Sequence, residues 1–582
     1  MQHLLASPPA ARWFLPGANA TVEVRRLAQA LGCPEALASL LWSRGFCQDE
    51  AARRFLAPRL RTLGDPYALP DLKPAVARLL RAIDAGERIV LYGDYDVDGV
   101  TSLALLSRLL TAYGGRPRCF LPRRMEEGYG LSADGVHRCM ETLRPQLLVT
   151  LDCGTSAVEE IAVLHRLGVE VIVVDHHECK AALPDCVAVV NPKRCDLPAA
   201  PEAEACGEDY RYLCTVGLVF KLCHALLKAR PLPGFDLRHG LDLVALGTVA
   251  DIVPLVHENR VLVHHGLAQL SQTRWPGVKA LMEVAGVSGP LRPSEVSFQL
   301  GPRLNAAGRL GTAHDALELL LTDDPARAAV LARSLDLQNR DRQQVEKATL
   351  TQAELQAGND PAAASAIVLG AEGWHPGVLG IVASRLCRKH HRPTWVIGFD
   401  EHGLGKGSGR SIRGFSLVAA LEGCRHLLER FGGHEMAAGL TIRRERFDEF
   451  VSLFRQCTSD ALGPDDLLPE VRPEMEVDFG ALDDDFLAFH EALQPFGMGN
   501  AQPLLVARGV CPTAAPRVLK EKHLRLSLEQ RGVRREALFF NMLPEALPRP
   551  PWDIAFRVEA NTWRGRTELQ IQLYRLRSCG AG

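Results

Sequence analysis

The sequence predicts an α/β protein in which a parallel-sheet domain is joined by a long helix to a smaller α/β domain, followed by a β-rich domain. Three observations support this. From Ile89 onward, short β-rich runs alternate with amphipathic helical segments, which is typical of βαβ units. Residues 324–357 are rich in Ala, Leu, Arg and Gln with almost no Gly, which predicts one long helix. Beyond about residue 470, alternating apolar and polar residues predict a small barrel.

Length and composition limit the functions that need to be considered. The chain of 582 residues is long enough for three or four domains. Its formal net charge of −2 indicates no general affinity for polyanions, so a nucleic acid would need a local basic groove. No apolar run is long enough to span a bilayer, and the first residues lack the features of a secretory signal. We therefore expect a cytoplasmic protein with no membrane association.

The elements of the first domain can be placed in order. Residues 1–85 show helix-like apolar spacing broken by prolines and carry no chemical motif, so we interpret them as a lead-in segment. Residues 86–323 form the first domain. Its strands are expected at 89–92, 147–151 and 169–174, and its first helix ends at Gly114-Gly115.

Acidic residues follow each of these strands, and one more lies near the end of a helical run. They are Asp94, Asp96 and Asp98 after the first strand, Asp152 after the second, Asp175-His176-His177 after the third, and Asp251 in the run over 240–255. Ligands of open α/β sheets bind at the carboxyl ends of the strands, so these residues are expected to converge. Clustered carboxylates repel one another, and a divalent cation commonly holds them together. Oxygen and imidazole donors suit Mn²⁺ or Mg²⁺, and a bridging carboxylate such as Asp152 suits a pair of ions in phosphoryl chemistry.

Two plainer interpretations compete for the motif Asp-x-Asp-x-Asp-Gly. A calcium-binding loop is excluded because its twelfth position, which requires a bidentate acid, is Leu105. Helix-capping, solvated acids remain an alternative for this motif taken alone. The occurrence of four such groups at the ends of predicted elements favours a metal centre.

The rest of the chain contributes a connector and two further domains. Residues 324–358 are the connector helix, and residues 359–464 form a second α/β unit with strands at 367–369 and 395–399. Three Gly-rich loops are predicted at 373–377, 405–413 and 432–439. They contain His375, Ser408, Arg410 and His434, a set of groups suited to a phosphate, although simple turns remain an alternative. Residues 465–582 form the β-rich domain, for which a five-stranded OB-type barrel is expected.

Together these motifs resemble the DHH phosphoesterase family, and in particular its single-strand-specific DNA exonucleases. Asp175-His176-His177 matches the motif that names the family, and Tyr92–Gly99, Asp152–Gly154 and Gly247–Asp251 match its other three motifs. The likeness extends from about residue 85 to the C-terminus. It implies a DHH catalytic domain, a DHH-associated substrate-binding domain and an OB-type domain that binds nucleic acid.

The resemblance also implies roles for individual residues. One ion would be held by Asp98, Asp152, His176 and Asp251, and a second, weaker one by Asp96 and Asp152. His177, Asp175 and Asp94 are the candidates for catalytic or supporting roles. One departure concerns Tyr92, because many family members carry there a His that serves the second ion. The number of Mn²⁺ or Mg²⁺ ions, one or two, therefore stays open.

Further residues are candidates for gripping DNA and its 5′-phosphate. They are Arg124, Tyr129, Arg303, Arg309, His375, Ser408, Arg410, His434 and Trp563. An arginine in a loop is more often a solvated surface charge. Most tryptophans belong to a core, and only some serve as stacking platforms for bases.

The predicted function is that of a metal-dependent 5′→3′ exonuclease that hydrolyses single-stranded DNA to 5′-mononucleotides in recombination and repair. One alternative is a DHH phosphodiesterase of short oligonucleotides or cyclic dinucleotides, which would not need the OB-type tail. Another is a non-catalytic DNA-binding DHH protein, whose ligand set would be broken. The expected partners are single-stranded DNA, a single-strand-binding protein and a helicase, and the chain is expected to act as a monomer.

Overall fold

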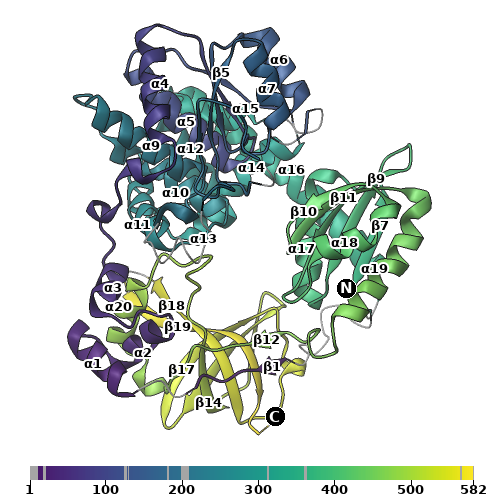
Figure 1. Ribbon diagram of the computed structural model, residues 1–582. Helices are drawn as coiled ribbons and strands as arrows, with labels where there is room; N and C mark the ends of the chain where they lie inside the picture. The colour runs from purple at the N-terminus through teal and green to yellow at the C-terminus, as the bar shows by residue number, and fades with distance from the viewer. Residues whose placement is uncertain are drawn as a thin grey trace. The chain divides into compact units, whose positions relative to one another are not determined.

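The computed structural model describes residues 11–17, 21–123, 127–128, 130–179, 182–197, 209–310, 313–358, 364–563 and 566–580. The chain, whose helices and strands are labelled in Figure 1, divides into two compact units by the contacts within each. Residues 58–343 and 495–501 form one, here called the aspartate unit. Residues up to 57, 344–494 and from 502 onward form the other, here called the barrel unit. None of the helices in these described ranges combines the length and the apolar content needed to cross a bilayer.

The aspartate unit is built on a parallel sheet, as the βαβ pattern predicts. In sheet order its strands are β3 (Arg118–Phe120), β2 (Ile89–Gly93), β4 (Leu147–Leu151), β5 (Glu170–Val174) and β6 (Ala188–Val190). Helices α4 (Leu72–Asp84), α5 (Val97–Ala112) and α9 (Thr215–Ala229) cover one face, and α6 (Ala133–Leu143) and α7 (Val158–Arg166) cover the other. Because both faces are covered, the central strands are apolar at nearly every position.

A helical layer continues the aspartate unit after α9. It comprises α10 (Leu241–Ala250), α11 (His257–Leu270), α12 (Pro276–Ala285), α13 (Pro293–Glu295), the π-helical turn η5 (Val296–Leu300), α14 (Gly301–Leu310) and α15 (His314–Leu321). Helix α10 packs against α5 and α9, which brings the end of α10 to the region where β2 leads into α5. The long helix α16 (Pro325–Ala357) follows, and its residues from 344 onward belong to the barrel unit.

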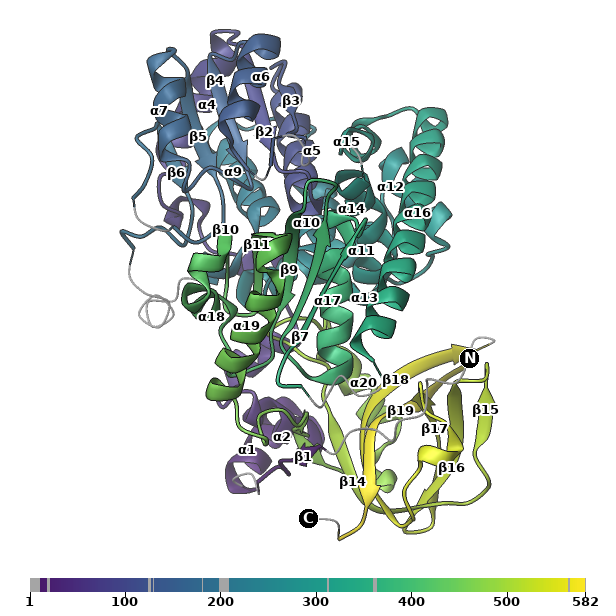
Figure 2. The ribbon, with the colours of Figure 1, turned by 90° about the vertical axis from the view of Figure 1, so that its right-hand side faces the viewer.

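The first sheet of the barrel unit contains both parallel and antiparallel pairs. Its order is β10 (Leu428–Gly433), β11 (Ala437–Arg443), β9 (Leu404–Arg410), β8 (Thr394–Phe399) and β7 (Ile367–Glu372). Helix α17 (Pro376–His390) packs on one face, whereas α18 (Leu417–Gly423) and α19 (Phe447–Ala461) pack on the other (Figure 2).

Two of the predicted Gly-rich loops prove to be strands, so that expectation was wrong. Residues 405–410 lie in β9, and residues 432–439 lie largely in β10 and β11. The glycines allow neighbouring side chains to approach closely, since a Cβ at Gly409 would lie 2.7 Å from the ring of Trp395 and one at Gly407 would lie 2.8 Å from Leu440. Glycine in a strand often marks such close packing rather than a turn.

The C-terminal part of the barrel unit is an OB-type barrel, as predicted. Its strands are β13 (Met475–Glu476), β14 (Leu505–Pro512), β15 (Arg517–Leu519), β16 (His523–Gln530), β17 (Val533–Phe540), β18 (Trp552–Trp563) and β19 (Arg566–Ser578). The order β14-β18-β19-β17-β16 closes on itself because β14 also pairs with β16. Helix α20 (Asp484–Ala492) packs beside β18 and β19.

The N-terminal residues up to 57 belong to the barrel unit. They form β1 (Arg12–Trp13), α1 (Thr21–Leu31), α2 (Glu35–Ser43) and α3 (Asp49–Leu56). Strand β1 pairs in parallel with β12 (Glu470–Val471). Arg44 Nε donates to Glu474 Oε2 at 2.7 Å, which adds an ion pair to this attachment.

Candidate metal centre

The aspartates that follow the strands meet at one edge of the parallel sheet. Asp94, Asp152 and Asp175 come directly after β2, β4 and β5, whose last residues are in register. The backbone ladder continues through them, because the Asp94 amide donates to Leu151 O at 3.2 Å and the Asp152 amide donates to Val174 O at 3.0 Å. The sheet therefore places side by side three side chains that are distant in sequence.

The backbone at Asp152 is unusual as well. Its φ of 67° lies in the left-handed region, which most side chains avoid but which Asp and Asn tolerate best after Gly. An aspartate here supplies a buried carboxylate and fits the backbone at the same time.

The carboxylate of Asp98 is held by the start of α9. The Thr215 amide donates to Asp98 Oδ2 at 2.7 Å, and the Val216 amide donates to Oδ1 at 2.8 Å. A helix N-terminus carries partial positive charge, so it stabilises a buried carboxylate. The Thr215 hydroxyl also donates to Asp152 Oδ1 at 2.9 Å and thereby joins the two acids.

His176 faces three of the predicted metal ligands. Its Nε2 lies 3.4 Å from Asp152 Oδ1, 3.5 Å from Asp251 Oδ2 and 4.0 Å from Asp98 Oδ2. Within the described residues, neither ring nitrogen of His176 has a hydrogen-bond partner, and the buried Asp251 Oδ2 has none either. An imidazole nitrogen that faces three carboxylates without a hydrogen bond to them gives a donor set suited to a divalent ion.

The charges of these groups point to the same conclusion. Burial, together with the nearby charge of Asp96, raises the pKa of Asp98 to about 7. Burial and Asp98 raise the pKa of Asp251 to about 8, and the pKa of Asp152 is also well above its usual range. Burial and the charge of His177 lower the pKa of His176 to about 3, which keeps its ring neutral and able to bind a metal. A cation among these acids would relieve their repulsion, so the residues fit Mn²⁺ or Mg²⁺.

A second group of acids shares one member with the first. Oxygens of Asp94, Asp96 and Asp152 lie within 4.8 Å of one another. Asp96 is also the N-cap of α5, where its Oδ1 accepts from the Gly99 amide at 3.1 Å. Asp152 thus stands between two groups of donors, which is the arrangement that a bridging carboxylate requires.

Asp175 orients the site, and among the described residues it belongs to none of the groups that could hold a metal ion. It accepts from the amides of Thr155, His176 and His177 at 3.0, 2.8 and 3.1 Å, and from His177 Nδ1 at 2.7 Å. Burial opposes its charge, but the hydrogen bond and charge of His177 hold its pKa well below the usual range. Burial would likewise lower the pKa of His177, yet Asp175 raises it to about 9. The pair is therefore an aspartate bound to an imidazolium.

Sequence reasoning missed three residues of this site: Thr215, Asn191 and Cys214. Asn191 Nδ2 donates to Thr155 Oγ1 at 2.8 Å and to His177 O at 2.9 Å, which fixes the loop after β5. Cys214 lies within reach of Asp98 and Asp251. Burial and the charge of Asp98 raise the pKa of its thiol well above the usual range. The only sequence signal was that Thr215 stands where a strongly apolar helix begins.

Tyr92 points away from the metal centre. Its hydroxyl donates to Gly130 O at 3.1 Å, and its ring stacks on Phe120 with the ring centroids 5.0 Å apart. The side chain is fully buried between the sheet and the layer of α6 and α7. It therefore occupies a core position, and it offers the acids of the second group no ligand.

The residues expected to bind DNA beside this centre are described only in part. Arg124 and Tyr129 lie outside the described residues, and only the backbone of Arg309, in α14, is described. Arg303 Nε donates to Asp336 Oδ1 at 2.9 Å, and its NH1 donates to Gln299 O at 2.6 Å. These contacts give Arg303 a role in holding α14 to α16.

Of the candidates in the barrel unit, Ser408 and Arg410 lie together at the end of β9. Arg410 NH1 donates to Ser408 Oγ at 3.1 Å, and a Cβ at Gly380 of α17 would lie 3.0 Å from Arg410 NH2. His375 caps α17, and its Nδ1 accepts from the Gly377 amide at 3.0 Å. His434 is exposed in the turn before β11, whose Ala437 pairs with Arg410. Trp563 ends β18, and nothing is described of its side chain.

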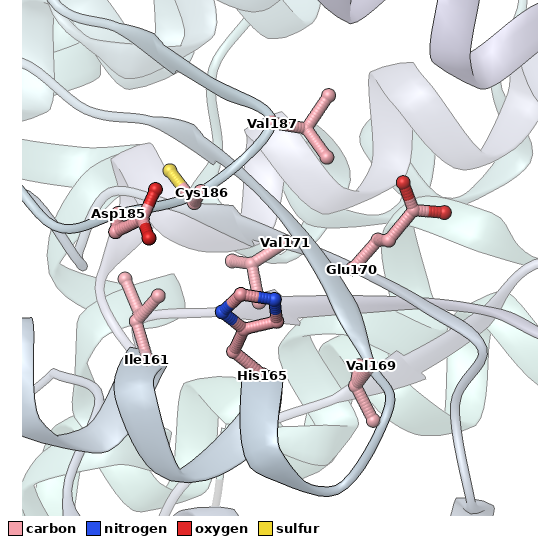
Figure 3. A pocket seen from close by; sticks show the side chains of 8 residues that line it. All are labelled: Ile161, His165, Val169, Glu170, Val171, Asp185, Cys186 and Val187. Carbon is pink, nitrogen blue, oxygen red and sulfur yellow. The ribbon is translucent and has the colours of Figure 1, made fainter.

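A separate pocket lies at the opposite edge of the parallel sheet. Figure 3 shows it between the end of α7 and the starts of β5 and β6. Its polar side chains include His165, Asp185 and Cys186, and its wall includes Val169. Because the acids follow the carboxyl ends of the strands, this pocket is not part of the metal centre, and its surroundings provide control positions for mutagenesis.

Fold and site together define a metal-dependent phosphoesterase of the DHH class. Residues 88–248 match the DHH family N-terminal domain, residues 359–460 the DHHA1 domain and residues 474–575 the RecJ OB domain. The chain is 36% identical to the single-stranded-DNA-specific exonuclease RecJ of Bacillus subtilis, over 95% of this chain and 69% of the relative. It is 35% identical to RecJ of Escherichia coli, over 86% of this chain and 89% of the relative.

Solved structures give the same result. RecJ of Thermus thermophilus in complex with Mn²⁺ is similar with a TM-score of 0.82 and 34% identity, over 98% of this chain and 80% of that one. Its complex with Mg²⁺ is similar with a TM-score of 0.77 and 32% identity, over 98% of this chain and 79% of that one. The chain belongs to the RecJ family.

Proposed function

We propose that the protein is an exonuclease that uses Mn²⁺ or Mg²⁺ to hydrolyse single-stranded DNA from its 5′ end to 5′-mononucleotides, in recombination and repair. The observation that carries this proposal is the buried, intact donor set of Asp98, Asp152, Asp251 and the neutral His176. A non-catalytic DHH protein would have lost part of that set. A phosphodiesterase of cyclic dinucleotides would not need the OB barrel that this chain carries.

At the phosphodiester, some residues would bind metal ions, one would stabilise charge on the phosphate and others would position the ligands. Asp98, Asp152, His176 and Asp251 would hold one ion, and Asp94, Asp96 and Asp152 a second. When bound, the metal supplies Lewis acidity and neutralises charge on the phosphate. Asp175 fixes Nδ1 of His177 and keeps the ring charged, so the imidazolium would stabilise negative charge on the phosphate. Thr215 and the amides of α9 keep Asp98 in place during this chemistry.

The other domains would recognise the strand. Residues 359–464 would bind the phosphorylated 5′ end through Ser408, Arg410 and His434, and residues 465–582 would bind the strand that follows. An enzyme limited to single strands depends on a helicase to unwind duplexes and meets DNA coated by a single-strand-binding protein. We expect it to act in the cytoplasm as a monomer.

End-labelled oligonucleotides test this function directly. With Mn²⁺ or Mg²⁺, a 5′ label is expected to appear at once in a mononucleotide, whereas a 3′-labelled strand shortens gradually. A chelator should stop both reactions, and a blunt duplex should resist digestion. Internal cuts from the outset, equal digestion of duplexes, or activity in the chelator would each contradict the proposal.

Arg410→Ala is expected to reduce the preference for a 5′-phosphorylated end about ten-fold, because a charge-assisted hydrogen bond to the phosphate is lost. Arg410 is half-buried beside Ser408, and burial lowers the pKa of its guanidinium, so a bound anion would favour its charge. The measurement is the ratio of kcat/KM on phosphorylated and unphosphorylated ends. Arg413→Ala is the control, since that side chain is 85% exposed. An unchanged ratio in Arg410→Ala would rule out this phosphate site.

A further inference from the structure

Three large apolar side chains are exposed on chain segments that adjoin the segments bearing the metal ligands. Ile252, which follows Asp251 directly, is 67% exposed; Phe298, in η5, is 77% exposed; and Met498, in the segment 495–501, is 57% exposed. Burial of an apolar side chain lowers the free energy of the folded state. Because these three side chains are exposed, they do not contribute that stabilisation. A group of such side chains at one place marks a binding surface more often than scattered ones do.

Ile252 is unfavourable in its backbone as well. Its φ of 61° lies in the left-handed region, where a β-branched side chain crowds its own backbone. Strain of this kind persists where the surrounding structure enforces it, and it gathers at functional sites. Asparagine or glycine would adopt the same conformation with less strain. The isoleucine is therefore present despite both its conformation and its exposure.

Helix α14 and the π-helical turn before it bring Phe298 to the same region. A Cβ at Gly301 would lie 3.5 Å from the Cβ of Ala250, the residue before Asp251. At the other end of α14, a Cβ at Gly308 would lie 2.9 Å from the carbonyl oxygen of Tyr95, between Asp94 and Asp96. The helix therefore borders both ligand-bearing segments. Phe298 lies roughly one helical turn before the Ala250 contact, in a π-turn of the kind often found at functional sites.

Met498 is carried to the centre by a segment from the C-terminal part of the chain. The amide of Leu255 donates to Met498 O at 2.7 Å. Next to it, a Cβ at Gly499 would lie 3.0 Å from Pro254. The segment therefore lies on the stretch of chain that follows Ile252, within the aspartate unit.

We propose that Ile252, Phe298 and Met498 form an apolar ledge that receives the unpaired bases next to the scissile phosphate. The inference rests on the proposed function. A phosphodiester held at Asp251 has its flanking bases within one nucleotide of the side chain that follows Asp251. Apolar contact accepts any base, because every base has an apolar face, and only unpaired bases leave that face open. The ledge thus contributes to selectivity for single strands without a preference for sequence.

Oligonucleotides with and without bases at their 5′ end distinguish this role from a structural one. One substrate carries ordinary nucleotides, and the other carries tetrahydrofuran abasic residues at its 5′-terminal positions. For the wild type, removal of the bases is expected to lower kcat/KM roughly ten-fold, mainly through KM. Phe298→Ala is expected to lower kcat/KM on the ordinary substrate by a similar factor and to reduce the ratio between the two substrates towards one.

Two further variants complete the design. Ile252→Asn should lower the same ratio while raising the Tm of the metal-free protein, because the left-handed conformation is no longer strained. Leu167→Ala, a control of similar exposure at the other edge of the sheet, should keep the wild-type ratio.

The outcomes of this experiment separate the inference from the proposed function. If the wild type digests single strands and Phe298→Ala keeps the wild-type ratio, the ledge is refuted and the exonuclease assignment stands. Equal losses of Phe298→Ala on both substrates would also refute it, since they would indicate a structural role. A wild type that digests neither substrate would overturn both.

Discussion

Asp152→Asn is expected to lower metal-dependent digestion of single-stranded DNA by about a thousand-fold or more. Asp152 is close to His176 on one side and to Asp94 and Asp96 on the other, so it belongs to both donor groups. Asparagine keeps the left-handed backbone and the size of the side chain but loses the charge. The measurement is kcat/KM on a 5′-phosphorylated oligonucleotide with Mn²⁺.

Stability measurements show whether such a loss is chemical. Burial and then the charges of Asp98 and its acidic neighbours raise the pKa of Asp152, so ionised Asp152 destabilises the metal-free protein. The metal-free variant should therefore keep or exceed the wild-type Tm, whereas the rise in Tm that Mn²⁺ causes in the wild type should largely vanish. Asp185→Asn, an exposed acid beside the pocket at the other edge of the sheet, is the control. Full activity in Asp152→Asn would disprove the metal centre.

Asp175→Asn is expected to lower kcat about a hundred-fold while leaving Mn²⁺ able to raise the Tm. The carboxylate accepts four hydrogen bonds, from three amides and from His177 Nδ1. An asparagine amide group cannot accept on its nitrogen, so at least one buried donor would lose its partner, and the ring of His177 would lose its orientation.

A comparison with Glu178→Gln isolates this effect. Glu178 lies in the same loop but is exposed. It forms a long, surface ion pair with Lys193 at 3.8 Å, so its charge should contribute little to stability or catalysis. If Asp175→Asn abolished the Mn²⁺-induced rise in Tm, Asp175 would be needed for metal binding, and its role in orienting His177 would have to be abandoned.

The sheet and the acidic residues could be predicted because both depend on local rules. Strands β2, β4 and β5 are short apolar runs. Each is followed directly by an aspartate, a residue that is rarely buried in a hydrophobic core. The rule that parallel strands present their carboxyl ends at one edge then brings Asp94, Asp152 and Asp175 together. No comparable rule predicts that Thr215 contacts Asp152 or that Asn191 contacts Thr155. Both contacts depend on how a later helix and loop pack against the sheet.

The Gly-rich segments show where local rules fail. In isolation, the glycines of β9 favour turns. The structure uses them as strand residues because Trp395 and Leu440 fill the space where their side chains would be. Tyr92 was recognised as a departure from the family's His, but its packing between β2 and α6 could not be predicted from the sequence.

The segment 495–501 sets a practical limit on dissecting this enzyme. The chain passes from one unit to the other at 57/58, 343/344, 494/495 and 501/502, so no single truncation separates the units. A fragment that ends before the barrel, the obvious choice for measuring what the barrel adds, would also remove Met498 O, the acceptor for the Leu255 amide. Its weaker activity would then mix two causes. Point substitutions on the barrel strands measure the contribution of the barrel alone, because they keep the hydrogen bond between the Leu255 amide and Met498 O.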